Sequence, residues 1–401
     1  MKLGELIEIK HGYAFSGEHI VEDDNGIVLV TPGNFRIGGG FKEEKCKFFD
    51  GEIPADYVLK EGDFIVTMTD LSKTIDTLGY SALVPKSKRT YLHNQRIGLV
   101  TFKSDECDRG YIYWLMRTRE YQRSIANTST GATVHHTSPK KIYDYDLEVP
   151  PLSTQHRIAS ILSRYDSLIE NYQKQIKLLE EAAQRLYKEW FIDLRFPGHE
   201  NTKIVDGVPE GWERKKVGEI GTVITGKTPS TSNKENYGGS IPFITIPDMH
   251  IGIYPVSSVF LSEKGAESQS KKYIPQGALI VSCIGTAGLV CITKERCQTN
   301  QQINSLILDD KEMLHYMYFV FLSLKEHLNN IGSNGATMTN VNKSKFEGID
   351  IVVPSSCIIR DFSQRTTPYF ENILSLQSQL RLLTEARDRL LPKLMSGEIT
   401  V

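Results

Sequence analysis

The chain contains two copies of one pattern, and this repeat limits its possible folds more than any other feature. Short motifs recur in the same order with an offset of about 204 to 215 residues. The matching segments, first copy first, are 3–12 with 217–226, 29–38 with 244–252, 59–67 with 274–282, 93–100 with 299–308, and 130–150 with 334–354. Self-similarity of this kind indicates a duplicated structural module.

The repeat continues into a segment with helical spacing. YDSLIENYQKQIKLLEEAAQRLYKEWF, from Tyr165, aligns with YFENILSLQSQLRLLTEARDRLLPKLM, from Tyr369, and ten of the 27 positions are identical. Each copy therefore consists of a globular part followed by a long helix.

The globular parts are predicted to be rich in β-strands. Runs such as IVLVTP, DFIVTMT and RIGLVTF are short, β-branched and bounded by Gly, Pro, Asn or Asp, which is typical of strands. CDRGYIYWLMRTREYQRSI has helical spacing, and the second copy repeats it as MLHYMYFVFLSLKEHLNNI. We expect these helices to pack on the sheets.

Each long helix carries a heptad seam, which predicts a partner helix along its length. The first helix is expected from about Ser153 to Phe191. In the second, Thr367 as N-cap and Pro368 at the first helical position predict a start there after a separate short turn, with an end at Pro392 and Gly397. The seam positions are Ile158, Leu162, Tyr165, Ile169, Tyr172, Ile176, Leu179, Ala183, Leu186 and Trp190, then Phe362, Thr366, Tyr369, Ile373, Leu376, Leu380, Leu383, Arg387, Leu390 and Leu394.

These patterns predict an α+β fold, within the broad α/β class, with a pseudo-two-fold internal repeat. We expect β-rich globular domains at 1–152 and 198–355, and spacer helices at 153–197 and 356–401. The helices satisfy both seams if they run antiparallel as a coiled coil. The alternative is that each helix packs on its own globular domain.

Composition is that of a globular protein, with 40% hydrophobic and 24% charged residues among 401. The apolar runs are shorter than a membrane span, and the N-terminal sequence does not resemble a signal peptide. The six cysteines show no C-x-x-C pair, so we expect reduced thiols and a cytoplasmic location. A net charge of −2 means that any nucleic-acid binding must depend on local basic patches.

Two like modules related by an approximate two-fold axis match the geometry of duplex DNA. A two-fold protein spans half-sites separated by about one helical turn, roughly 34 to 36 Å. Because the two copies differ most in their loops, the sequence predicts an asymmetric bipartite target.

The layout resembles the specificity (S) subunit of type I restriction-modification systems. The most specific stretches are LLEEAAQRLYKEWFIDLRFPGHE (178–200) and LRLLTEARDRLLPKLMSGEITV (380–401), and VPPLSTQHRIASIL, VDGVPEGWERKKVGEI and the Asn-Gln elements at 94–95 and 300–301 add support. The resemblance covers essentially the whole chain. In the second helix Thr366, Pro368 and Arg387 depart from an apolar seam.

The resemblance implies a DNA-recognition subunit without catalytic activity. Its two target recognition domains would each read one half of a split sequence, and its helices would fix the gap. The implied partners are double-stranded DNA, two methyltransferase (M) subunits that use S-adenosylmethionine, and restriction and translocation (R) subunits that use ATP and Mg. No cofactor is expected in this chain itself.

Candidate DNA-binding residues lie where the two copies are polar and different. Small residues, hydroxyls, amides and lysines suit phosphate contact and base reading, although a glycine-rich surface turn would look alike. The candidates are Arg36, Lys73, Arg96, Thr133, His135, His136, Lys140 and Lys141 in the first copy, and Lys227, His250, Gln301, Gln302, Thr337, Thr339, Asn340, Asn342 and Lys343 in the second.

Other chemistry is weakly indicated. The chain lacks an N-P-P-[YF] or D-P-P-[YF] adenine pocket and a persuasive nuclease cluster, and the His135–His136 pair lacks further ligands at zinc spacing. The resemblance assigns Tyr187, Trp190 and Phe191 to methyltransferase docking; the alternative for these rings is packing between helix and globular domain.

Two other function classes stay open. GTVITGKTP (221–229) matches the Walker A pattern, with LILDD (306–310) downstream, as in a nucleotide-binding enzyme. However, PSTSNKENYGG after Thr228 does not suit the helix that a phosphate-binding loop needs, and only Gly226 keeps its identity in the first copy. The third possibility is a coiled-coil scaffold that binds only proteins.

Overall fold

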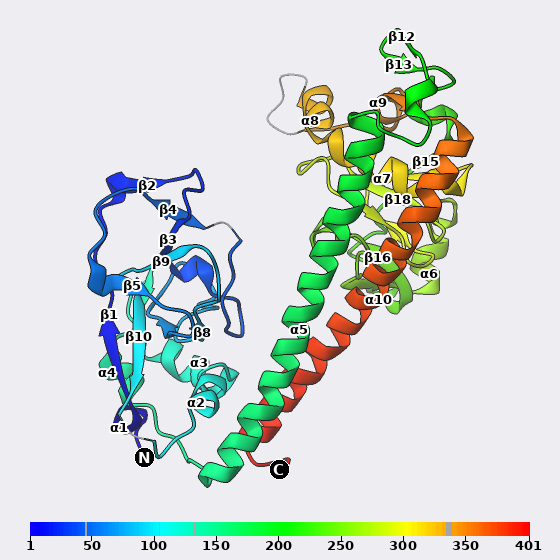
Figure 1. Cartoon of the computed structure of the whole chain (residues 1–401). Helices are drawn as coiled ribbons and strands as arrows, with labels where there is room; N and C mark the ends of the chain where they lie inside the picture. Colours follow the sequence, from blue (N-terminus) through cyan, green and yellow to red (C-terminus); the bar gives the residue numbers. More distant parts are fainter. Residues whose placement is uncertain (45, 104, 132, 334–338) are drawn as a thin grey trace. The chain divides into compact units, whose positions relative to one another are not determined.

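The protein is described by a computed structural model that covers all residues except 45, 104, 132 and 334–338 (Figure 1). It divides into two compact units. Unit 1 comprises Met1–Ile169 and Leu383–Val401, and unit 2 comprises Glu170–Leu382. Each unit therefore holds one globular part with one end of each long helix. The predicted division at 152, 197 and 355 differs from this one, because the helices are shared between the units.

In unit 1 the main sheet has the antiparallel order β1-β10-β6-β8 (Ile7–His11, Ile97–Phe102, Phe64–Thr67, Ser81–Leu83). A second sheet has the order β2-β4-β3-β9-β5 (Ile20–Val21, Lys47–Phe49, Ile27–Val30, Thr90–His93, Val58–Leu59), with β3 and β9 parallel. The short strand β7 (Thr69–Asp70) pairs with β11 (His135–His136). The helices are α1 (Leu3–Leu6), α2 (Arg109–Leu115), α3 (Arg119–Asn127) and α4 (Pro139–Tyr143).

Unit 2 repeats the topology of the main sheet and has a shorter second sheet. Its main sheet is β15-β21-β18-β19 (Gly221–Thr225, Ile303–Leu308, Leu279–Ser282, Val290–Ile292), and a second sheet is β17-β16-β20 (Val259–Leu261, Tyr237–Ile244, Gln298–Thr299), with β16 and β20 parallel. Further pairs are β12-β13 (Ile204–Val205, Val208–Pro209) and β14-β22 (Glu213–Lys216, Asp350–Val353). The helices are α6 (Glu263–Glu267), α7 (Leu314–Ser323), α8 (Lys325–Ser333) and α9 (Lys343–Glu347). The predicted duplication of β-rich modules is confirmed.

The long helices are α5 (Leu152–Tyr187), which continues as a π-helical turn over Lys188–Ile192, and α10 (Ser356–Met395). In unit 1 Asp166 of α5 bonds to Arg387 of α10, and in unit 2 Trp190, at the end of the π turn, packs on Phe362. Contacting residue numbers rise on one helix as they fall on the other, so the segments pair antiparallel. The predicted seam positions are buried or half-buried on both helices, which confirms the heptad interpretation.

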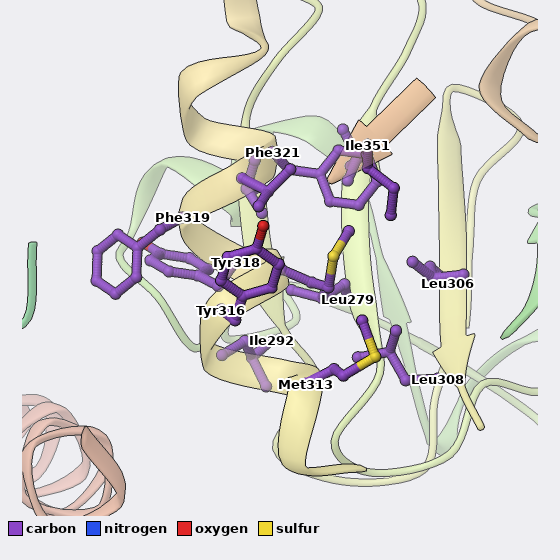
Figure 2. Packing of buried hydrophobic residues seen from close by; sticks show 14 of the residues in the cluster. Leu279, Ile292, Leu306, Leu308, Met313, Tyr316, Tyr318, Phe319, Phe321 and Ile351 are labelled. Atoms are coloured by element: carbon purple, nitrogen blue, oxygen red, sulfur yellow. The ribbon is translucent and has the colours of Figure 1, made fainter. Parts of the chain in front are cut away.

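The core of unit 2 lies between the main sheet and α7. Figure 2 shows Tyr316, Tyr318, Phe319 and Phe321 of α7 together with Leu279 and Leu306 of the sheet. These residues belong to one buried cluster that also includes residues of α5 and α10. The C-terminal part of α5 and the N-terminal part of α10 thus belong to the globular core of unit 2.

The prediction that α10 starts at Pro368 is wrong, because the helix begins at Ser356 and continues through Pro368 and Pro392. Proline removes one backbone donor and usually breaks a helix. Here the flanking positions are strongly buried, with Phe362, Thr366 and Phe370 at most 1% exposed. Burial of this face stabilises the helical conformation through the proline.

Arg387, a polar position in the α10 seam, has a defined partner in unit 1. Its guanidinium lies 2.6 Å from Asp166, and the other Asp166 oxygen pairs with Arg117. Arg117 is 4% exposed in its side chain and also stacks on Trp114 at 4.2 Å. Asp166 thus joins α10 to the turn after α2 through a largely buried ion cluster.

Thr366, the other polar seam position, lies in unit 2. Its hydroxyl donates to the Phe362 carbonyl at 2.8 Å, so its oxygen accepts from Nδ1 of His315 at 2.9 Å. The His315 ring stacks on Phe370 with centroids 4.0 Å apart. Burial lowers the pKa of His315 to about 4.

We predict that Asp166→Ala lowers the free energy of unfolding by about 3 to 5 kcal/mol, because it leaves the buried Arg117 guanidinium without a counter-charge, whereas Arg387 keeps its pair with Asp388. Denaturant unfolding of the full chain measures this. The control is Asp361→Ala, which removes an exposed pair with Arg365 on the same helix and should cost about 0.5 kcal/mol or less. Equal losses in the two variants would contradict a buried ion cluster.

We also predict that acid destabilises unit 2 through His315. The folded pKa is about 4 against an ordinary 6.5, so between these values the unfolded chain binds the extra proton. Stability is therefore full above pH 6.5 and falls as pH drops, by roughly 3 kcal/mol at pH 4. Unfolding of wild type and His315→Gln across this range should differ in slope, with the exposed His327→Gln as the control. Parallel pH profiles for wild type and His315→Gln would refute the prediction.

Candidate nucleic-acid interface

Three segments of unit 1 meet at one end of the main sheet, and we call residues 67–70, 94–97 and 135–137 the unit 1 junction. The Met68 amide donates to the Arg96 carbonyl at 2.9 Å, and the Thr137 amide donates to the Met68 carbonyl at 3.0 Å. His135 pairs with Asp70 between β11 and β7. The fold thus brings together the predicted residues Arg96, His135 and His136, which are far apart in the chain.

Unit 2 builds the same junction from residues 282–284, 300–303 and 339–341. The Cys283 amide donates to the Gln302 carbonyl at 2.8 Å, and the Val341 amide donates to the Cys283 carbonyl at 2.9 Å. Asn340 forms a bridge with Ile284. The predicted residues Gln302, Thr339 and Asn340 therefore lie together, at the backbone positions that Arg96, His135 and His136 occupy in unit 1.

A glycine packs closely against the backbone of each junction. An added Cβ would lie 2.1 Å from the Asn300 carbonyl oxygen at Gly226, and 2.1 Å from that of Asn94 at Gly12. The next residue donates its amide to the adjacent strand end, Tyr13 to His93 at 2.8 Å and Lys227 to Thr299 at 3.0 Å. Both glycines are there because only a hydrogen fits against the backbone of the turn.

This geometry excludes the Walker A interpretation. Gly221–Thr225 forms strand β15, paired with β21, where a phosphate-binding loop needs an open turn. No helix starts at Lys227 or Thr228 in this described segment; a 3-10 turn follows only at Lys234–Asn236. Without a helix N-terminus the site lacks the amides that would hold phosphates. Lys227 is instead an exposed cation beside the unit 2 junction.

Lys73 lies on a loop that follows strand β7 of the unit 1 junction and is anchored by a buried carboxylate. Asp70 is 2% exposed and accepts from the amides of Ser72 and Thr77, each at 2.6 Å. Burial acts to raise the Asp70 pKa, but the hydrogen bonds from Ser72 and Thr77 outweigh it and hold the pKa below its usual range. Asp70 stays ionised, and Lys73 is exposed on the loop that it holds.

Several predicted residues have structural partners. Lys141 donates to the Thr128 carbonyl, whereas Thr133 and Lys140 are exposed beside β11. In unit 2 Asn342 is the N-cap of α9, accepting from the Lys345 amide at 3.0 Å, and exposed Lys343 lies 3.4 Å from Glu347. Gln301 accepts from the Thr228 hydroxyl. Thr337 lies outside the described residues.

Arg36 and His250 are not brought into the junctions by the contacts described. The Nε of Arg36 donates to the Phe41 carbonyl at 3.1 Å, within its own turn. His250 lines a pocket of about 390 Å³ with Glu180 and Gln184 of α5. It therefore lies on the side of its globular part that faces the helices.

Sequence reasoning missed Tyr13 and Asp70. Tyr13 is 42% exposed and occupies the position of Lys227 in the other copy, so the repeat itself could have identified it. No such signal existed for Asp70, because the corresponding segment of unit 2 contains no carboxylate.

The three predicted docking rings are buried. Tyr187, Trp190 and Phe191 are 8%, 5% and 9% exposed. They pack within unit 2, for example Tyr187 on Phe319 at 5.2 Å and Phe191 on Tyr316 at 4.7 Å. Their burial leaves little ring surface exposed, and a role of these rings in docking another subunit stays a prediction. The alternative interpretation, packing between helix and globular domain, describes their environment.

Polar side chains gather around the junctions. The part of the chain that is described holds no group of three or more His, Cys, Asp or Glu side chains suited to a metal ion. The six cysteines, all described, are free thiols, and burial raises the pKa of Cys283, Cys291 and Cys297 to about 12. Within the described residues, no helix combines the length and hydropathy needed to cross a membrane.

Duplicated β-rich units, joined by paired helices and ending in equivalent polar junctions, define a two-domain recognition protein. The family model for the type I restriction modification DNA specificity domain matches residues 1–181 and 209–360. The chain therefore belongs to the specificity subunits of type I restriction-modification systems, which are DNA-recognition rather than catalytic components.

Individual relatives agree. The chain is 36% identical to the type I restriction enzyme HindI specificity subunit of Haemophilus influenzae, over 70% of this chain and 75% of the relative. It is 29% identical to the MjaIX specificity subunit of Methanocaldococcus jannaschii, over 73% and 69%. The fold matches the crystal structure of a type I restriction-modification S subunit from M. genitalium with a TM-score of 0.64 and 16% identity, over 98% of this chain and 95% of that one.

In the GTVITGKTP segment, Gly226 packs against backbone and Lys227 is exposed, and substitutions can separate these two roles. Gly226→Ala should destabilise the full chain by about 2 kcal/mol or more, because the new Cβ meets backbone at 2.1 Å. Lys227→Ala, one residue along and exposed, should change stability by no more than about 0.5 kcal/mol. Thermal unfolding of the two variants measures this difference. If Gly226→Ala were as stable as wild type, close backbone packing would not explain the glycine at this position.

Proposed function

We propose that the two junctions are the DNA-reading surfaces, and that each reads one half of an asymmetric bipartite site. One observation carries this proposal. The two junctions share the same backbone hydrogen bonds between their segments, but the side chains at the equivalent positions differ. Such a scaffold holds the reading groups in one geometry and lets their chemistry vary.

The side chains suit base recognition. Arginine contacts guanine through O6 and N7, and asparagine or glutamine contacts adenine through N6 and N7. Unit 1 offers exposed Arg96 and His136, and unit 2 offers half-buried Gln302 and exposed Asn340 at the equivalent positions. Different groups at equivalent points read different bases, so the two half-sites differ.

Phosphate contact would come from the residues flanking each junction. Lys227 in unit 2 and Tyr13 in unit 1 occupy one position, but only the lysine can neutralise a phosphate. Unit 1 carries its nearby cations on Arg96, Lys73 and Lys140 instead. We infer that phosphate positioning is distributed differently in the two units, which is compatible with a net charge of −2 for the chain.

The helices α5 and α10 would set the gap between the half-sites. A continuous α-helix rises about 1.5 Å per residue and resists bending, so it can act as a spacer. The chain itself would need no cofactor. Two methyltransferase subunits that bind S-adenosylmethionine, and restriction subunits that bind ATP and Mg, would supply the chemistry in a complex with double-stranded DNA.

The experiment that tests this function is selection of binding sequences from randomised duplexes by the full chain in its complex. We expect a split consensus for wild type. Arg96→Ala should reduce base preference by about fivefold or more at a position in one half, and Gln302→Ala should do so only in the other half, as loss of a bidentate contact predicts.

Each variant is the control for the other, and Lys86→Ala is a further control. Lys86 follows β8, which runs antiparallel to β6, so it lies toward the opposite end of the sheet from the junction. A selection without any consensus for wild type would overturn the recognition function. Loss of preference in both halves from either single variant would overturn the division of reading between the units.

A further inference from the structure

The two junctions differ in one loop. In both units the strand end and a glycine close the loop in the same way, with Gly79 donating to Thr67 and Gly288 donating to Ser282, each at 3.0 Å. The segment between these anchors is 68–78 in unit 1 but only 283–287 in unit 2. Unit 1 therefore carries an insertion at the junction.

The insertion is well ordered by its own hydrogen bonds. Besides the amides of Ser72 and Thr77, Asp70 accepts from the Thr77 hydroxyl at 2.7 Å and from the Leu78 amide at 3.1 Å. On the outer side Gln122 donates to the Ile75 carbonyl at 2.6 Å. A buried carboxylate that satisfies several backbone amides holds a loop in one conformation.

The loop also continues the reading surface. Its base is strand β7, which pairs with β11, and the Thr69 hydroxyl lies 3.2 Å from Nδ1 of His136. Beyond Asp70 the side chains of Leu71, Lys73 and Thr74 are exposed. These groups are a hydrophobic side chain, a cation and a threonine methyl, whose hydroxyl donates to Asp76. Groups of these kinds contact base edges and thymine methyl groups.

Charge indicates what the loop contributes. Lys73 and Asp76 balance each other outside the buried Asp70, so the loop adds little net attraction to phosphates. A loop without net positive charge beside a reading surface alters discrimination more than overall affinity.

We propose that the Leu71–Thr77 loop, positioned by Asp70, is an additional base-reading element of unit 1, so that unit 1 reads a longer half-site than unit 2. This rests on the proposed function of the junctions. Asp70 acts as a positioning residue through the loop, and Lys73 as one of its contact residues.

The test is the same selection from randomised duplexes, with the full chain in its complex. Wild type should show base preference over more positions in the half read by unit 1, which Arg96→Ala identifies. Lys73→Ala should remove about tenfold discrimination at one outer position of that half. Asp70→Ala should remove discrimination at all the positions that the loop reads, while the other half stays unchanged. Lys86→Ala is the matched lysine control.

The outcomes separate the proposals. Half-sites of equal length in wild type, or unchanged preferences in both Lys73→Ala and Asp70→Ala, would overturn the loop's role while leaving the junctions as readers. If Asp70 served only stability, Asp70→Ala would weaken all sequences evenly, and Lys73→Ala, which leaves the core intact, would leave the consensus unchanged. A wild-type chain without sequence preference would overturn the proposed function itself.

Discussion

The carboxylate of Asp166, held between Arg117 and Arg387, joins α5 and α10 to the turn that follows α2 in unit 1. Arg117 belongs to the turn that follows α2 in the globular part, whereas Arg387 belongs to α10 near the end of the chain. Taking these charges out of water is costly unless each is paired, so the arrangement tolerates few alternatives. A leucine seam can slip by a heptad at modest cost, but a slip here would separate buried charges. The ion cluster therefore fixes the register of α10 against α5 and α2.

The repeat shows that unit 1 has this ion cluster and that unit 2 has apolar residues at the equivalent positions. Under the helix alignment, Asp166 corresponds to Phe370 and Arg387 corresponds to Ala183, both buried in the core of unit 2. A pair of two α5 helices would place Asp166 against an alanine, and a pair of two α10 helices would place Arg387 against a phenylalanine. Either pairing would lose the ion pair between Asp166 and Arg387 and place a charged side chain against an apolar one. Divergence of the two copies thus favours pairing of α5 with α10 over pairing of identical helices.

These polar positions also mark how far the sequence alone could predict the structure. The heptad spacing and the repeat predicted the helices, the β-rich modules and the correspondence of the segments that form the two junctions. Arg387 was visible as an interruption of the seam, but its partner Asp166 lies outside the predicted seam positions, so periodicity could not reveal it. Pro368 led to the wrong helix start, because local propensity does not register the burial of Phe362 and Phe370, which stabilises the helix through the proline.

At the junctions, too, the sequence reveals some residues and not others, and the reason is physical. Gly12 and Gly226, and the amides of Met68 and Cys283, are set by backbone packing, so both copies retain them and the repeat can reveal them. The side chains at the equivalent positions Arg96 and Gln302 differ, although the Gln302 side-chain amide also donates to the Ile284 carbonyl at 3.4 Å. Asp70 falls between these cases: it is structural, but it supports a loop that only one copy has. A comparison of the two copies cannot detect such a residue, because its importance depends on amides that only the folded chain brings to it.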